Sequence, residues 1–264
     1  DEDTRFTDKL PAATDADVDK VSYELATKAA NGKATVNADG SYSYVPNANF
    51  HGTDSFTYSV NDDKGGINTY TVSLTINSIE DLPVAANASQ ILDEDTRFTG
   101  NLPTATDGDG DQISYSLETQ ATNGKATVNA DGSYSYVPNA NFHGTDAFTY
   151  SVSDDKGGSN TYTVSLTVNS VNDLPVAANT SATLDEDTRY SGKLPTATDA
   201  DGDKVTYALV TQPVNGEATI NADGSYSYTP YGDFHGKDSF IYSVNDGKGG
   251  SNNYSVNLTI NSVN

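Results

Sequence analysis

Apolar and polar residues alternate along many short segments of this chain. From 162 to 168 every second residue is Tyr, Val or Leu, and the residues between them are Thr or Ser. Segments 148–152 and 113–117 show the same period of two. This alternation is typical of strands with one buried face, and no segment keeps helical spacing beyond one turn. The pattern predicts an all-β chain.

Turn residues separate the alternating runs. The segment "KATVNADGSYSY" at 125–136 places Asn-Ala-Asp-Gly between two short runs, and "SDDKGGSN" at 153–160 joins two more through paired glycines. Such turn residues between alternating runs are strong hairpin signals. Both segments therefore predict β-hairpins.

The whole pattern repeats every 92 residues. "DEDTR" begins at 1, 93 and 185, and residues 1–92 match residues 93–184 at 72 of 92 positions. A unit of this size has room for its own core, and about seven short strands with one apolar face indicate a β-sandwich. We expect three tandem antiparallel β-sandwich domains in a linear array, with bounds 1–80, 81–172 and 173–264. The first copy lacks the "PVAAN" lead-in of the others, so we expect an N-terminally truncated repeat and a piece of a longer protein.

Charge and composition narrow the possible partners. The chain has 37 acidic and 14 basic side chains, a formal net charge of −23, and no cysteine. Phosphates would be repelled, so we expect no binding to nucleic acid or anionic lipid. No apolar run approaches the ~20 residues of a membrane helix, so we expect no membrane insertion. The 17 tyrosines and 8 phenylalanines, regularly placed, argue against a disordered acidic chain.

The segment "DGDGD" at 107–111 crowds three aspartates together, and related segments stand at 15–19 and 199–203. One interpretation is a solvated loop in which Asp and Gly satisfy turn geometry. An EF-hand is a second, but Gln112 occupies the position of its glycine and the flanking residues alternate as in strands. The third is a calcium site assembled from several loops.

Other acids recur at fixed positions and favour the third interpretation. Every repeat carries "DED", an aspartate before a strand in "GTD" or "GKD", and acids at a hairpin tip, while "IEDLP" and "VNDLP" connect the repeats. Calcium takes six to eight oxygen ligands, mostly carboxylate and carbonyl. Acids gathered at strand ends and connectors supply such ligands, and their mutual repulsion is a cost without the ion.

The order of these motifs resembles a cadherin repeat, and more closely the bacterial cadherin-like or Ig-like repeats of giant RTX-type adhesins. The resemblance spans nearly the whole chain and implies Ca²⁺ at each junction between repeats. For the first junction the implied ligands are Glu2, Asp54, Glu80, Asp81, Asp107, Asp109 and Asp154. For the second they are Glu94, Asp146, Asn172, Asp173, Asp199, Asp201 and Asp246. The connector is shorter than in the family, Glu80 replaces its Asn, and Val18 replaces the glycine of the other two acidic loops.

The sequence gives few signals for a histidine metal site, a sugar-binding surface or a catalytic centre. His51, His143 and His235 occur one per repeat, so we expect turn-capping or packing roles and not a shared metal or catalytic centre. Tyr134 and Tyr136 share a strand face, which favours core contacts over a sugar-binding platform. No catalytic motif is present, and an active site is seldom built three times over.

These observations lead to one expected function and two alternatives. The resemblance implies a non-enzymatic, monomeric spacer of an extracellular bacterial cell-surface adhesin, whose repeats contact one another and are stiffened by calcium ions. The first alternative is that the repeats bind a ligand directly, such as a glycan, ice or a sister adhesin. The second is an accessory domain of a secreted enzyme.

Overall fold

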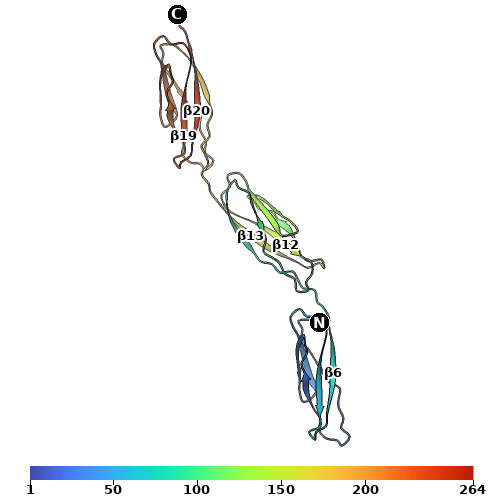
Figure 1. Ribbon diagram of the computed structural model, residues 1–264. Coiled ribbons are helices and arrows are strands. Elements are labelled where there is room, and N and C mark those ends of the chain that lie inside the picture. Colours follow the sequence, from blue (N-terminus) through green and yellow to red (C-terminus); the bar gives the residue numbers. More distant parts are fainter. Residues whose placement is uncertain (264) are drawn as a thin grey trace.

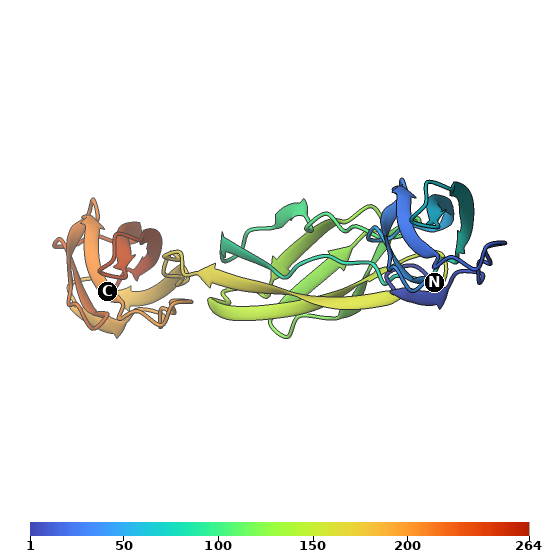
Figure 2. The same ribbon diagram turned by 90° about the horizontal axis from the view of Figure 1, so that it is seen from below.

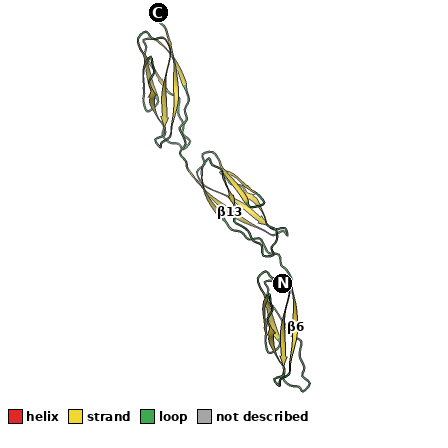
Figure 3. Ribbon diagram, in the orientation of Figure 1, coloured by secondary structure: helices red, strands yellow, loops and turns green. Residues whose placement is uncertain are grey.

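The computed structural model describes residues 1–263, which form three bodies that follow one another end to end (Figure 1). Every regular element among these residues is a strand, as the yellow and green ribbon of Figure 3 shows. None of the described residues belongs to a helix of the length and hydropathy needed to cross a membrane. The predicted all-β fold of tandem sandwiches is confirmed.

The first repeat packs two three-stranded sheets, in the orders β1-β4-β3 and β2-β5-β6. Its strands are β1 (Phe6–Lys9), β2 (Ser22–Thr27), β3 (Gly32–Val36), β4 (Ser41–Pro46), β5 (Gly52–Asn61) and β6 (Ile67–Ile76).

The second and third repeats each pair a three-stranded sheet with a four-stranded one. The orders are β10-β11-β8 and β7-β13-β12-β9, then β15-β18-β17 and β14-β20-β19-β16. The second repeat contains β7 (Ala88–Asp93), β8 (Phe98–Asn101), β9 (Ser114–Thr119), β10 (Gly124–Val128), β11 (Ser133–Pro138), β12 (Gly144–Ser153) and β13 (Ser159–Asn169). The third contains β14 (Thr180–Asp185), β15 (Tyr190–Lys193), β16 (Thr206–Thr211), β17 (Gly216–Ile220), β18 (Ser225–Pro230), β19 (Gly236–Asn245) and β20 (Ser251–Asn261).

Both predicted hairpins form. Strands β10 and β11 pair antiparallel with Val128 opposite Tyr134, and β12 and β13 pair from Ser153 opposite Ser159 onwards. The hairpin tip at 154–158 therefore lies at the end of the sandwich through which the chain enters the repeat. This position matters because the tip carries Asp154.

Each repeat has its own hydrophobic core. In the second repeat Tyr136, Phe148 and Tyr150 are fully buried, and Tyr150 Oη donates a hydrogen bond of 2.6 Å to the carbonyl of Ala86. The rings of Tyr134 and Phe148 lie 5.7 Å apart in a tilted arrangement, a favourable geometry for aromatic pairs. The prediction that Tyr134 and Tyr136 are core residues is confirmed.

One sheet edge differs from the predicted antiparallel pattern. Strand β7 pairs parallel with β13, and β14 pairs parallel with β20. A chain that enters a sandwich at one end and leaves at the other must run its first and last strands in the same direction. Among the described residues β6 has no such parallel partner, and the N-terminus lies at the joint with the second repeat (Figure 1).

Candidate metal centres between the repeats

The acidic loops of the second and third repeats each meet the connector that precedes the repeat. We call the contact of the first repeat, connector 77–83 and the second repeat junction one. There the backbone N–H of Asp81 donates to Asp109 Oδ2 at 2.9 Å, and Ser78 Oγ donates to Asp109 Oδ1 at 3.0 Å. These two donors, with the imidazole of His51, hold the pKa of Asp109 below its usual value.

The contact of the second repeat, connector 169–175 and the third repeat is junction two, and it repeats this arrangement. The backbone N–H of Asp173 donates to Asp201 Oδ2 at 2.7 Å, and Ser170 Oγ donates to Asp201 Oδ1 at 3.3 Å. The previous repeat joins in through Asn141, whose side-chain amide donates to Asp173 Oδ2. The predicted residues Asp109, Asp173 and Asp201 thus lie at the joints between repeats.

A buried glutamate closes each junction from the preceding repeat. Glu2 is 1% exposed and Glu94 is 2% exposed. In each, Oε1 accepts a hydrogen bond from the connector backbone, from Ile79 N at 2.6 Å and from Val171 N at 2.7 Å. Backbone pairing with the end of the same repeat places both glutamates there, because Glu2 N donates to the Asn77 carbonyl and Glu94 N donates to the Asn169 carbonyl.

The hairpin tip of the following repeat contributes one more aspartate. Asp154 Oδ1 accepts hydrogen bonds of 2.8 Å from the backbone N–H groups of Lys156, Gly157 and Gly158. Burial raises the pKa of Asp154, but these N–H groups together bring the pKa below its usual value. Its second oxygen, Oδ2, is buried and has no donor. The carboxylate is thus held in place through one oxygen, while the other has no hydrogen-bond donor.

Carboxylate oxygens without a donor are concentrated at the two junctions. Among the described residues, the buried side-chain oxygen and nitrogen atoms that lack a hydrogen-bond partner are Glu2 Oε2, Asp107 Oδ2, Asp154 Oδ2, Glu94 Oε2 and Asp199 Oδ2. A buried carboxylate oxygen without a partner is costly, so each of these atoms calls for a cation or donor. The first three lie at junction one and the last two at junction two. This donor set of hard oxygens fits a calcium ion.

Repulsion between carboxylates supports the same fit. Ligand oxygens of Glu80, Asp109 and Asp111 lie within 4.8 Å of one another, as do those of Asp199, Asp201 and Asp203. Desolvation, and then the negative charges of the surrounding aspartates, raise the pKa of Glu80 above its usual value. A divalent cation would remove this repulsion.

The two junctions differ in one connector residue. At junction two the amide of Asn172 donates to Asp246 Oδ2 at 2.8 Å, whereas at junction one Glu80 stands in its place and Asp154 Oδ2 has no donor. Junction one therefore carries one more carboxylate. Within junction one, desolvation and then the charge of Asp109 raise the pKa of Asp81, whereas the pKa of Asp109 is lowered.

Two predicted ligands point into their own repeats instead of into a junction. Asp54 Oδ2 accepts hydrogen bonds from Tyr44 Oη at 2.8 Å and from Asn31 N at 2.8 Å. Asp146 Oδ2 is bonded in the same way by Tyr136 Oη at 2.8 Å and Asn123 N at 2.9 Å. Both carboxylates are satisfied by protein donors, and we leave Asp54 and Asp146 out of the proposed ligand sets.

The sequence interpretation missed the position of the histidines. His51 Nδ1 lies 3.7 Å from Glu2 Oε2 and 3.9 Å from Asp109 Oδ1, and its side chain is 49% exposed. His143 Nδ1 lies 3.7 Å from Glu94 Oε2. Both side chains are exposed at the junctions, so the predicted packing role is wrong for His51 and His143, whereas a turn-capping role stays a prediction. The recurrence of "FHG" at the same spacing as "DED" was the available signal, but it does not reveal that the two meet in space.

Comparison with known proteins places the fold in a family. The family model for the bacterial Ig domain matches residues 1–75, 80–167 and 172–259. A search of curated protein sequences finds no match. Among solved structures, protocadherin gamma B2 extracellular cadherin domains 1–5 align at 13% identity and a TM-score of 0.55, covering 92% of this chain and 53% of that one. Mouse cadherin-23 EC22–24 aligns at 19% identity and a TM-score of 0.51, covering 97% and 92%.

Some structural matches extend well beyond this chain. An endo-fucoidan hydrolase from glycoside hydrolase family 107 aligns at 18% identity and a TM-score of 0.34, and the chain spans 42% of its length. That score is too low to support any inference about activity. At these identities the matches establish the sandwich fold alone.

Proposed function

The chain belongs to the bacterial Ig domain family, and from that premise we propose that it is a calcium-stiffened spacer. The observation that carries the proposal is the position of the buried carboxylate oxygens without a donor, which within residues 1–263 all belong to side chains at the two junctions. The resemblance of the acidic motifs to cadherin-like repeats of bacterial adhesins supports calcium as the ion.

The proposed ligands come from three places at each joint. For junction one they are Glu2, Glu80, Asp81, Asp107, Asp109 and Asp154. For junction two they are Glu94, Asn172, Asp173, Asp199, Asp201 and Asp246. Calcium bound there would neutralise the carboxylates and link two repeats through the connector. The protein itself already fixes these groups, since the connector backbone donates to Asp109 and to Asp201.

Calcium would limit the bending of the array. Without a cation, the carboxylates on both sides of each connector repel one another, and a few hydrogen bonds oppose that repulsion. With the ion, separating two repeats would also require removing oxygen ligands from a divalent cation. The joint is then stiff at the millimolar calcium found outside cells, since extracellular modules bind with Kd values of roughly 10⁻⁴–10⁻³ M.

A repeated unit suits a spacer. All three repeats keep the acidic loop, the hairpin aspartate position and the glutamate after "D" in "DED". Each added copy would lengthen the array by one sandwich and one joint without new chemistry. We therefore propose an extracellular, non-enzymatic role as a monomeric extension of a bacterial surface adhesin, while direct binding of a glycan, ice or a sister adhesin stays an alternative prediction.

Small-angle scattering with and without a chelator tests the proposal. We expect the maximum dimension and the melting temperature to fall when EDTA removes calcium, because both joints lose their cross-link. Replacing Asp107 and Asp109 together by Asn is expected to loosen junction one and to leave junction two intact. An EDTA-insensitive dimension and melting temperature would contradict the proposed function.

A further inference from the structure

A histidine faces the closing glutamate in all three repeats. The distance from the imidazole Nδ1 to the glutamate Oε2 is 3.7 Å for His51 and Glu2, 3.7 Å for His143 and Glu94, and 3.5 Å for His235 and Glu186. These separations are too long for a hydrogen bond. At the two junctions the glutamate Oε2 is buried and has no hydrogen-bond donor, and the imidazole Nδ1 faces it.

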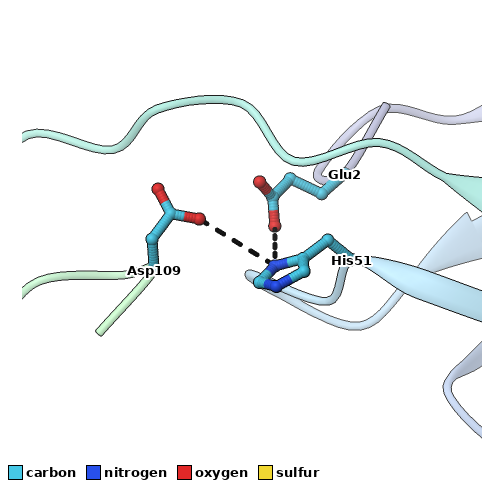
Figure 4. Close-up of side chains that lie close together, drawn as sticks. All are labelled: Glu2, His51 and Asp109. Carbon is cyan, nitrogen blue, oxygen red and sulfur yellow. Dashed lines mark ion pairs between the residues drawn. The ribbon is translucent and has the colours of Figure 1, made fainter. Parts of the chain in front are cut away.

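At junction one a third side chain completes the group. Asp109 Oδ1 of the second repeat lies 3.9 Å from His51 Nδ1, and ligand atoms of Glu2, His51 and Asp109 all lie within 4.8 Å of one another. Figure 4 shows the three side chains converging from separate segments. In the described part of the chain, His143 has no aspartate of the third repeat within 4.0 Å. The threefold group is thus specific to junction one.

A glycine of the acidic loop is tightly enclosed at junction one. A Cβ added at Gly108 would lie 1.9 Å from Asn49 Nδ2 and 2.0 Å from Asp81 Oδ2, far inside van der Waals contact. Those two atoms are hydrogen-bonded to each other at 2.8 Å. Ala200 occupies the corresponding position at junction two. A methyl group at Gly108 would therefore displace the acidic loop that carries Asp109 or the two groups that it contacts.

We propose that Glu2, His51 and Asp109 form a binding site for a divalent transition metal of the zinc class, bridging the first and second repeats. Imidazole nitrogen with two carboxylates suits zinc, whereas calcium selects oxygen alone. Two ligand atoms at about 2.1 Å from one zinc ion lie about 3.4 Å apart at a tetrahedral angle and about 4.2 Å apart at most. The observed 3.7 and 3.9 Å fall inside this range.

This site deepens the proposed function and rests on its junction geometry, because Glu2 and Asp109 belong to both ligand sets. Zinc therefore competes with calcium at junction one and leaves junction two to calcium alone. The exposed side of His51 leaves room for water as a further ligand. The array would have one joint that responds to two kinds of metal ion.

Zinc titration of the whole chain by isothermal calorimetry, in calcium-free buffer, tests the inference. We expect His51→Ala to weaken the tightest zinc-binding event by at least ~10-fold, since even loss of an outer-shell partner typically costs about 10–100-fold. His143→Ala is the matched control and is expected to bind zinc as the unchanged chain does. Gly108→Ala is expected to weaken zinc binding too, although it removes no ligand.

Calcium titration of the same variants separates this inference from the proposed function. Retained calcium affinity together with lost zinc affinity in His51→Ala supports the site. Equal zinc affinity in the unchanged chain and His51→Ala, or equal loss in His143→Ala, would overturn it. Absence of calcium binding with zinc binding intact would overturn the calcium proposal and leave the zinc site standing. Circular dichroism of His51→Ala checks that the variant folds, and we expect that it does because the His51 side chain is exposed.

Discussion

The glutamate that closes junction two offers a test in which calcium changes the size of the effect. Glu94→Gln keeps the shape of the side chain, and its amide oxygen still accepts the hydrogen bond from Val171 N. It replaces the donorless Oε2 by an NH₂ group and removes a buried charge. In EDTA the hydrogen bond from Val171 N therefore becomes weaker, because its acceptor is no longer charged. The substitution also removes the cost of a buried carboxylate oxygen that has no donor. These two effects are each about 1–3 kcal/mol and oppose each other.

Calcium alters that balance. An ion that binds only the folded state stabilises it by about 2.7 kcal/mol when its free concentration is 100 times Kd, for example ~10 mM calcium and a Kd of ~10⁻⁴ M. For a domain of this size each kcal/mol raises the melting temperature by roughly 4–8 °C, so the unchanged junction should gain about 11–22 °C. Loss of one carboxylate ligand should remove at least half of that gain in Glu94→Gln.

Differential scanning calorimetry in EDTA and in 10 mM calcium chloride measures the melting temperature without calcium and its rise when calcium binds. Glu118→Gln is the matched control, because Glu118 is an exposed glutamate on β9 of the same repeat. We expect the control to keep the full calcium-induced rise. If Glu94→Gln showed the same rise as the control, or lost as much stability in EDTA as in calcium, Glu94 would be a structural residue and not a ligand.

Three further predictions follow from particular contacts. Glu80→Asn should lower the calcium affinity of junction one, because it removes a carboxylate, and Asn172→Glu should raise that of junction two, because it adds one beside Asp246. Calcium calorimetry measures both affinities, and a change in the same direction for the two variants would contradict the reasoning. Burial, and then the neighbouring tyrosines, raise the pKa of Tyr150 to about 12, whereas the pKa in the unfolded chain is about 10. The stability should therefore hold below pH ~10 and fall as the pH rises towards ~12, and thermal melts across this range measure it. Leu92→Ala removes the buried side chain of β7 and should cost about 2–5 kcal/mol, whereas Ile91→Ala on the exposed face should stay within about 0.5 kcal/mol, measured by hydrogen exchange of the second repeat.

The period of two predicted most of the fold because one face of each strand is buried. The same period also determines which way Asp54 faces. Asp54 stands two residues before Phe56, which is buried in the core of β5, so the same alternation directs Asp54 inwards, where Tyr44 Oη meets it. The recurrence of an aspartate before this strand suggested a ligand, but its position on the strand face decides its partner.

The histidine site lay beyond what spacing can reveal. Glu2, His51 and Asp109 are separated by 49 and 58 positions in the sequence, and they meet only because a connector places the loop of one sandwich beside the end of another. The parallel pairing of β7 with β13 was hidden for a related reason. It depends on where the chain enters and leaves a repeat, and no local pattern records that direction.

The parallel first and last strands have a mechanical consequence. Viewed from below, the three bodies still follow one another, so a pull on a tethered array would run from joint to joint through each sandwich (Figure 2). In the second repeat that tension enters through β7 and leaves through β13, which are bonded side by side over six residue pairs. Force directed along two such strands shears all their backbone bonds together instead of unzipping them one by one. The second and third sandwiches, which both have this parallel pair, are therefore built to resist stretching along the direction in which the repeats follow one another.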